Sequence, residues 1–294
     1  MTKDRIYTNN NDWYQPTHRV EVTDETGQIK EVHIVTEFPL TIKVNDKEIV
    51  TLMTLGTHPE YLILGYLKNQ RMIEDYADIT SLEVNLRGET ASITTREDRV
   101  IDLKHKMSRK IVTTGCGEGT VFSCSLDKIY DIRLQPFPIK KSSIYNLLKE
   151  IRPLNVIYAA GGSVHTCALC SLDRVLILIE DVGRHNAADS IAGKMWAEDI
   201  SGSDKLFYTT GRITSEIVIK AALMNIPILI SRSGITKMGL DIARNLGMTI
   251  IARAKGKRFF VYNNHEMIDF EERGDSLKER DRKSLLFKKH IKMF

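Results

Sequence analysis

The second half of the chain alternates between short apolar runs and helical patterns, and this rhythm limits the fold more than any other feature. A helical spacing of apolar residues at 142–158 is followed by two apolar runs, 164–171 and 174–181, which predict a hairpin. Such an order indicates a mixed or parallel sheet covered by helices, and therefore the α/β class. The segments expected after the hairpin are helix 184–198, strand 205–209, helix 214–224, strand 227–232, helix 236–246 and strand 249–254.

The first part of the chain has a different pattern, typical of a small α+β unit. Leu40, Ile42 and Val44 alternate with polar residues and predict strands joined by a turn at Asn45-Asp46. Pro59 stands where a helix would begin. We also expect a hairpin around 87–89 and a strand at 100–103.

These patterns divide the 294 residues into five segments. The expected α+β unit and the α/β core are joined by a loop that carries Cys116. The charged end of the chain includes a possible amphipathic helix near 285–294. The segments are an irregular N-terminal arm at 1–30, the α+β unit at 31–112, the cysteine-bearing loop at 113–127, the core at 128–262 and a charged tail at 263–294.

Charge favours an anionic partner, and hydropathy excludes a membrane-spanning helix. Residues 1–110 carry 15 Lys and Arg against 18 Asp and Glu, whereas residues 111–294 carry 27 against 20. The basic second half suits an anionic partner, although a solvated surface gives the same excess. Apolar runs are far shorter than the ~18 residues of a membrane span, and the first residues show no signal-peptide pattern. We therefore expect a cytoplasmic protein with no membrane partner.

Three expected strand-to-helix turns combine a glycine, a hydroxyl or amide group, and an arginine. They lie at 180–186, 209–216 and 231–237. In α/β sheets ligands bind at such turns, where free N–H groups of the following helix favour anions. Ordinary helix capping uses the same residue types, but three turns in the same topological position favour an anionic ligand. The candidate ligand-binding residues are Gly183, Arg184, His185, Gly211, Arg212, Ser231 and Ser233.

A fourth basic segment follows the last expected core strand. Four bases around a glycine would cradle a phosphate, and an ordinary exposed turn has the same composition. The segment would also suit a nucleic-acid backbone, but no known nucleic-acid module is visible, so we expect no nucleic-acid partner. Its residues are Arg253, Ala254, Lys255, Gly256, Lys257 and Arg258.

Four cysteines offer thiol or metal chemistry. Cys116 stands between two glycines, which are poor packing neighbours, so we expect an exposed thiol able to act as a nucleophile or sulfur carrier. Cys167 and Cys170 have the spacing of a zinc site or a redox pair, with His165 and Cys124 as further ligands. On a strand, however, residues three apart face opposite sides, and simple packing of both thiols stays open. No metal ligand is assigned.

The chain resembles the formate dehydrogenase accessory sulfurtransferase family (FdhD/NarQ) over roughly residues 31–262. Its most specific block is the stretch from Glu180 to Ala187. The remaining blocks that carry the resemblance are 37–45, 53–54 with 62–73, 161–165, 210–216 and 226–227.

The resemblance implies a cytidine-deaminase-like three-layer core and a homodimer. It also implies a sulfur carrier that takes sulfur from a cysteine desulfurase as a cysteine persulfide. The sulfur then passes to the molybdenum (or tungsten) bis-molybdopterin guanine dinucleotide cofactor, the bound substrate, before that cofactor enters formate dehydrogenase. By resemblance Cys116 is the catalytic carrier, and 253–258 binds the cofactor.

The sequence departs from the family pattern at one place. The family loop reads Cys-Gly-x-Cys-Gly, and here Gly119 replaces the second cysteine. Two alternatives stay open, and this departure motivates the first. The first is a chaperone that holds the cofactor without sulfur chemistry. The second is a metal-dependent hydrolase of the deaminase type, for which the helix start at 212–215 lacks the expected cysteine.

Overall fold

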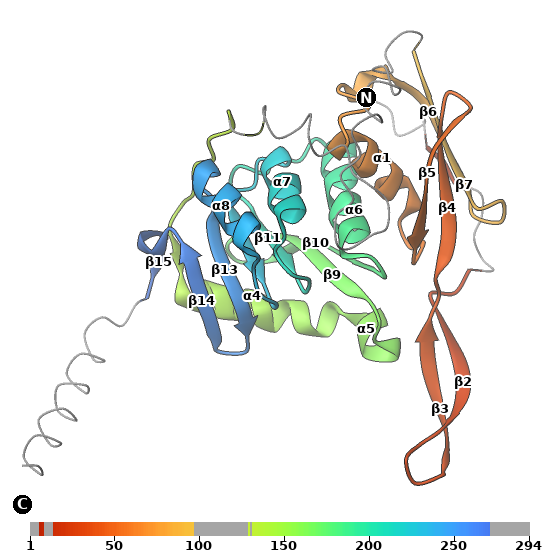
Figure 1. The fold of residues 1–294 in the computed structure, drawn as a ribbon, viewed down its shortest axis with the longest axis horizontal. Helices are drawn as coiled ribbons and strands as arrows, with labels where there is room; N and C mark the ends of the chain where they lie inside the picture. Colours follow the sequence, from red (N-terminus) through yellow and green to blue (C-terminus); the bar gives the residue numbers. More distant parts are fainter. Residues whose placement is uncertain (1–5, 9–13, 97–128, 130, 271–294) are drawn as a thin grey trace, which may run out of the picture.

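The computed structural model describes residues 6–8, 14–96, 129 and 131–270. Two sheets dominate this part of the chain, one built from N-terminal strands and one from the second half (Figure 1). The α/β class expected from the sequence is confirmed. No helix in the described ranges is both long and apolar enough to span a bilayer.

The N-terminal sheet has the strand order β1-β6-β7-β4-β5. The alternation at Leu40, Ile42 and Val44 points these side chains into a core with helix α1 (Pro59–Asn69), and the turn at Asn45-Asp46 is present with both residues at positive φ. The expected strand at 100–103 lies outside the described residues. The strands are β1 (Ile6–Thr8), β4 (Phe38–Val44), β5 (Lys47–Thr54), β6 (Ile79–Asn85) and β7 (Thr90–Thr95).

A separate two-stranded ribbon corrects the prediction of an irregular arm at 1–30. Strands β2 (Thr17–Thr23) and β3 (Ile29–Val35) pair antiparallel along their whole length and join neither sheet. The ribbon extends away from the body of the molecule (Figure 1). Asp24 closes its turn by accepting hydrogen bonds from the backbone N–H groups of Thr26 and Gln28.

The second sheet has the order β10-β9-β11-β12-β13-β14 and confirms the expected alternation of strands and helices. Strands β11, β12 and β13 are parallel, and β9, β10 and β14 run antiparallel to their neighbours. The elements are β9 (His165–Cys170), β10 (Val175–Asp181), α6 (Arg184–Ala197), β11 (Leu206–Thr209), α7 (Ser215–Leu223), β12 (Ile228–Ser231), α8 (Lys237–Leu246), β13 (Thr249–Lys255) and β14 (Arg258–Asn263).

Helices cover both faces of this sheet, so the core has three layers. Helices α6, α7 and α8 bury one face, which includes Leu169, Phe207 and Leu229. Helix α4 (Lys141–Leu154) buries the other face, which includes Tyr208 and Ile230. Figure 1 shows α4 and the three helices on opposite sides of the strands.

Two boundaries differ from those expected. The helix predicted at 142–158 is interrupted at Asn155, after Pro153, and continues as the short α5 (Val156–Gly161). Asn155 is held there because its amide donates to Ile151 O (3.2 Å) and its oxygen accepts from the Thr166 hydroxyl (2.6 Å). The segment expected as a charged tail from 263 begins with regular structure. Its first residues form the end of β14, a 3₁₀ turn (His265–Met267) and β15 (Ile268–Asp269), which pairs with β8 (Ile139–Lys140).

Helices α1 and α6 join the N-terminal unit to the core by packing backbone against backbone. A Cβ atom added to Gly65 would lie 1.7 Å from Asp189 O, and one added to Gly193 would lie 1.9 Å from Tyr61 O. Only glycine permits this approach. The seam positions the end of β5 against the turn that opens α6.

Candidate functional site

The turns singled out by the sequence lie side by side at one edge of the core sheet. Backbone hydrogen bonds join the turn at 209–216 to the turn at 231–237, and that turn to the basic segment at 253–258. Ile213 N–H donates to Gly234 O (2.9 Å), Arg232 N–H to Thr209 O (3.0 Å) and Arg253 N–H to Ser233 O (2.8 Å). The first turn joins them because a Cβ on Gly211 would touch the Arg184 side chain at 2.7 Å. Parallel strands end at the same edge, which is why separate segments of sequence meet there.

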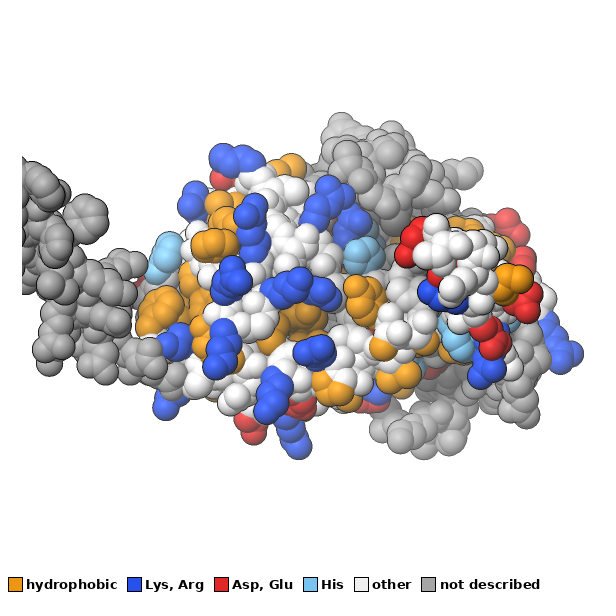
Figure 2. Space-filling view, turned by 90° about the horizontal axis from the view of Figure 1, so that it is seen from below, with side chains coloured by type: hydrophobic (Ala, Val, Ile, Leu, Met, Phe, Trp, Pro, Cys, Tyr) orange, Lys and Arg blue, Asp and Glu red, His pale blue; other side chains and the backbone are white. Residues whose placement is uncertain are grey.

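This edge carries a concentration of exposed positive charge. Figure 2 shows Lys and Arg side chains spread over the core on the face seen from below. A surface of this kind attracts phosphate groups, and the N-termini of α6, α7 and α8 add N–H groups beside it. The exposed bases of these turns are Arg212, Arg232, Lys237, Arg253, Lys255, Lys257 and Arg258.

Two candidate residues at this edge, Ser231 and Ala254, are buried inside the protein. Ser231 is fully buried, its hydroxyl donates to Gly211 O (2.7 Å), and it accepts from Ser233 N–H (2.9 Å). It therefore shapes two turns at once. Ala254 is also buried and packs in the core between sheet and α4.

The basic segment 253–258 is a β-hairpin rather than a loop after the last strand. Lys255 pairs with Arg258 across the turn, and β14 continues the sheet. Arg253 and Gly256 both adopt positive φ, 53° and 62°, so the strand is irregular where its bases emerge. Ala252 and Ala254 are buried on opposite faces of the sheet, while Arg253, Lys255, Lys257 and Arg258 are exposed.

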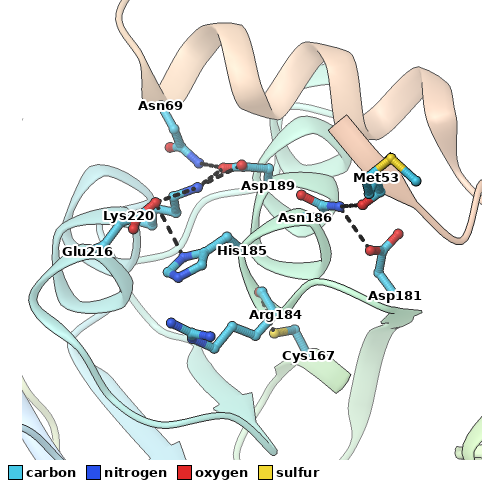
Figure 3. A network of polar contacts seen from close by, with 10 residues as sticks. All are labelled: Met53, Asn69, Cys167, Asp181, Arg184, His185, Asn186, Asp189, Glu216 and Lys220. Carbon is cyan, nitrogen blue, oxygen red and sulfur yellow. Dashed lines mark hydrogen bonds and ion pairs between the residues drawn. The ribbon is translucent and has the colours of Figure 1, made fainter. Parts of the chain in front are cut away.

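A buried polar network lies behind the turn that opens α6 (Figure 3). The Lys220 ammonium donates to both oxygens of Asp189, at 2.7 and 2.6 Å, and lies 3.6 Å from Glu216. Asn69 of α1 donates to the same carboxylate at 2.7 Å. His185 Nδ1 lies 3.3 Å from Glu216 Oε1. Burial and the neighbouring cations hold the pKa of His185 far below its usual value, so the imidazole is neutral at pH 7.

Two adjacent carboxylates organise the strand that precedes this turn. Asp181 accepts hydrogen bonds from Thr54 Oγ1 (2.5 Å), Leu55 N–H (3.1 Å), Gly183 N–H (2.8 Å) and Asn186 Nδ2 (3.0 Å). Burial raises the pKa of Asp181 to about 6, and the hydrogen bonds oppose that rise. Glu180 accepts from the N–H groups at the start of α5, at 2.9 Å each. The pair therefore anchors both α5 and the N-terminal unit to the site.

The described thiols are packed inside the core. Cys167 belongs to the cluster under α6, and Cys170 to the cluster under α4, so the two point to opposite faces of β9. Burial raises the pKa of each thiol to about 12, which makes a thiolate unavailable at neutral pH. Among the described residues no group of His, Cys, Asp and Glu has a metal-binding arrangement. Cys116 and Cys124 lie outside those residues.

Lys220 and Asn69 were not among the candidates from the sequence. The sequence held a weak signal, because Lys220 follows three consecutive apolar residues. In the structure the helix that carries them is mostly buried. A charge in such a stripe is rarely buried without a partner. Nothing local in the sequence identifies Asp189 as that partner, since the two are 31 residues apart.

Comparison with known proteins assigns the chain to a family. The sequence profile of the FdhD/NarQ family matches residues 35–269. The chain belongs to the FdhD/NarQ family. The matched region contains every strand of the two large sheets except β1, and all the turns described above.

Relatives of known name agree with this membership. The Sulfur carrier protein FdhD of Bacillus licheniformis is 30% identical over 242 residues, which cover 82% of this chain and 92% of that protein. The protein of the same name from Listeria innocua is 29% identical, over 83% of this chain and 95% of that protein. A crystal structure of a putative formate dehydrogenase accessory protein from Desulfotalea psychrophila superimposes with a TM-score of 0.68 at 26% identity, over 86% and 98% of the two chains. The FdhD/NarQ resemblance expected from the sequence is thus confirmed.

Proposed function

We propose that this chain is a sulfur carrier that serves the maturation of formate dehydrogenase in the cytoplasm. Its carrier residue is Cys116, and its donor is the persulfide of a cysteine desulfurase. The Cys116 thiolate attacks the outer sulfur of that persulfide, the desulfurase leaves as a thiolate, and Cys116 becomes the persulfide. The acceptor is the molybdenum (or tungsten) bis-molybdopterin guanine dinucleotide cofactor, held as a substrate. The working unit is a homodimer.

The observation that carries this proposal is the family membership over residues 35–269, together with the convergence of four basic turns at one sheet edge. A dinucleotide substrate has several phosphate groups, and Arg212, Arg232 and the 253–258 hairpin offer separate cations for them. His185 is buried behind the α6 start and lies against Glu216, so its neutral imidazole supports this turn without adding charge.

A cofactor-holding chaperone without sulfur chemistry is the second candidate, and one observation favours it. Gly119 stands where the family loop has its second cysteine. The basic edge would serve either role equally. The two candidates therefore differ only in whether Cys116 accepts sulfur.

Persulfide formation on Cys116 separates them. After incubation with a cysteine desulfurase and cysteine, intact-protein mass spectrometry should show the addition of one sulfur atom to the wild type and none to Cys116→Ala. Cys170→Ala is the matched control, because its thiol is buried and should not accept sulfur.

Formate dehydrogenase activity in cells that carry each variant gives the second readout. We expect loss of activity with Cys116→Ala and retention with Cys170→Ala. Full activity with Cys116→Ala and no sulfur adduct on the wild type would favour the chaperone. A sulfur adduct that persists in Cys116→Ala would move the carrier role to another thiol.

A further inference from the structure

His165 begins β9 at the sheet edge that carries the turns, and the function proposed above gives it no role. Its Nδ1 lies 3.4 Å from Thr210 Oγ1. Thr210 is itself held by two hydrogen bonds, because its hydroxyl accepts from Thr166 N–H (3.0 Å) and its own N–H donates to Thr166 O (2.9 Å). The imidazole of His165 therefore lies against the turn at 209–216.

Two arginines lie beside this imidazole. A Cβ added to Gly211, the residue after Thr210, would lie 2.7 Å from Cδ of Arg184, so that side chain runs along the turn. Burial and the positive charges of Arg184 and Arg212 lower the pKa of His165, so its imidazole is neutral at pH 7. The result is one group, the His165 cluster, made of His165, Thr210, Arg184 and Arg212.

The start of α6 lies at the same place. Its N-cap residue, Gly183, has no side chain that could accept from the first N–H groups. Unbonded N–H groups at a helix start attract anions, and the helix dipole adds to this attraction. A helix start alone is common to every α/β fold. Here it coincides with the His165 cluster, and that coincidence favours an oxyanion such as a phosphate group.

Acidic side chains close to the cluster are already engaged. Asp181, which pairs with His165 across β9 and β10, accepts four hydrogen bonds from other residues. Glu216 lies 3.3 Å from His185 and 3.6 Å from Lys220. The positive charge of the cluster therefore remains available for a bound anion.

We propose that the His165 cluster binds one phosphate group of the dinucleotide substrate and that His165 takes up a proton from solvent when this group binds. The two guanidinium groups donate to the phosphate oxygens. The protonated imidazole donates from Nδ1 to Thr210 Oγ1, which leaves the Thr210 hydroxyl hydrogen for a phosphate oxygen. No covalent bond forms or breaks. The inference rests on the proposed function and adds a residue whose charge state reports that the substrate is in place.

The charge of the phosphate reverses the electrostatic balance at His165. In the free protein two guanidinium groups oppose the protonated imidazole, whereas a bound dianion favours it and raises its pKa. The protonated form then binds phosphate more tightly than the neutral form. Affinity therefore rises as the pH falls from above neutrality toward the lower pKa of the free protein, and it is level below that pKa.

Other groups that titrate near His165 can be separated from it. His185 lies between Glu216 and the Arg184 side chain, and its pKa is far below the usual value, so it stays neutral (Figure 3). Asp181 has a pKa raised to about 6 and titrates in the same range as an imidazole. A test must therefore follow the His165 ring itself. The groups that face it are Asp181 on β10, Arg184 and His185 on α6, and Thr210 and Arg212 in the turn before α7.

Nuclear magnetic resonance on the full chain with isotope-labelled histidine follows each imidazole as the pH changes. Sulfate is the first probe, because it keeps its two negative charges near neutral pH, and sodium chloride at the same ionic strength is the reference. We expect sulfate to raise the titration midpoint of His165 by about one pH unit, which corresponds to about tenfold tighter binding of sulfate to the protonated form. The signal that disappears in His165→Gln identifies the residue, and a change of the same signal in Thr210→Val assigns it independently.

Guanosine diphosphate is the second probe and identifies the source of the phosphate. It should raise the midpoint of His165 at a lower concentration than sulfate, because the rest of the nucleotide adds contacts at the basic edge. Arg184→Gln should weaken sulfate binding by about tenfold. Arg244→Gln removes an exposed base from the far end of α8 and is its matched control, and His265→Gln, at an exposed histidine, should leave the response of His165 unchanged.

Each outcome decides a stated claim. Equal midpoints of His165 in sulfate and chloride overturn the subsite, whereas the carrier role of Cys116 depends on the persulfide assay and is decided separately. A rise with sulfate but not with guanosine diphosphate overturns the assignment to the dinucleotide. Equal weakening by Arg184→Gln and Arg244→Gln contradicts the inference, because net charge alone would then explain the binding.

Discussion

Lys220 shows how a single charged residue fixes neighbouring elements at the site. The residue is 4% exposed, its ammonium donates to Asp189 of α6, and Asn69 of α1 donates to the same carboxylate. Three helices therefore meet at one buried ion pair. Breaking such a pair by removing one partner leaves an uncompensated charge inside the protein.

Replacing Lys220 by Met should therefore destabilise the fold strongly. The expected loss in the free energy of unfolding is about 3–5 kcal/mol, because burial already raises the pKa of Asp189 and, without its cation, Asp189 must carry an uncompensated charge or bind a proton. Urea denaturation followed by circular dichroism measures it. Lys237→Met is the control, since Lys237 forms an exposed pair with Asp241 one turn along α8 and should change stability by less than about 0.5 kcal/mol. Similar losses in the two variants would contradict the assigned role.

Among single residues, those in turns could be predicted from the sequence better than buried polar residues. Gly211, Arg212 and Ser233 carry local signals, because glycine, arginine and hydroxyl groups cluster where a strand meets a helix. The roles of Ser231 and Lys220 depend on partners 20 and 31 residues away. Periodicity in a single sequence contains no information about such distant pairs.

At the scale of elements, the α1–α6 seam holds the N-terminal unit on the core. Gly65 and Gly193 remove the side chains that would otherwise separate the helices. Trp196, near the end of α6, packs against the core of the N-terminal unit, and its ring meets Tyr76 edge-on at 5.4 Å. The seam is thus an interior rather than a hinge between independent parts.

Gly193→Ala should open this seam. Its new Cβ would lie 1.9 Å from a backbone oxygen, which cannot move without shifting α1. Overpacking of this kind costs about 1–3 kcal/mol, more than the gain of about 1 kcal/mol from alanine in a helix. The thermal midpoint should therefore fall. Gly234→Ala has open space around the added atom and should leave the midpoint nearly unchanged; an unaffected Gly193→Ala would show that the helices are less tightly packed.

Elements in the core could be predicted because each has a strong period and ends at a glycine or polar turn. The β2–β3 ribbon could not, although Val20, Val22, Val32 and Ile34 alternate as a strand requires. Its many polar residues hid that alternation within a segment that reads as a loose arm. The break at Asn155 follows Pro153, a local signal that the apolar spacing outweighed, and the hydrogen bond with Thr166 that fixes it comes from β9, outside the helix.

At the scale of the whole molecule, charge is separated between the two units. The described N-terminal part is acidic, the core is basic, and the exposed bases of the turns lie on the face that Figure 2 shows. An anionic ligand is therefore drawn to one region of the surface. Attraction of this kind is screened as ionic strength rises.

Binding of guanosine diphosphate, the nucleotide portion of the proposed substrate, should follow this charge. Isothermal titration calorimetry should show weaker binding as salt increases. Arg212→Gln and Arg232→Gln should each weaken binding by about tenfold through loss of a charged hydrogen bond. Arg244→Gln removes an exposed base from the opposite end of α8 and should have little effect. Equal effects of all three would mean that only net charge matters.

The seam also has a consequence for synthesis of the protein. Helix α1 ends at Asn69, but α6, which covers it, ends only at Ala197, 128 residues later. At roughly 5–20 residues per second, a ribosome needs about 6–26 seconds to make that interval. During this time the nascent N-terminal unit presents the side of α1 that carries Gly65 without its cover. Chaperones that bind emerging chains could bind that surface during this interval. The surface would be covered only when α6 had left the ribosome.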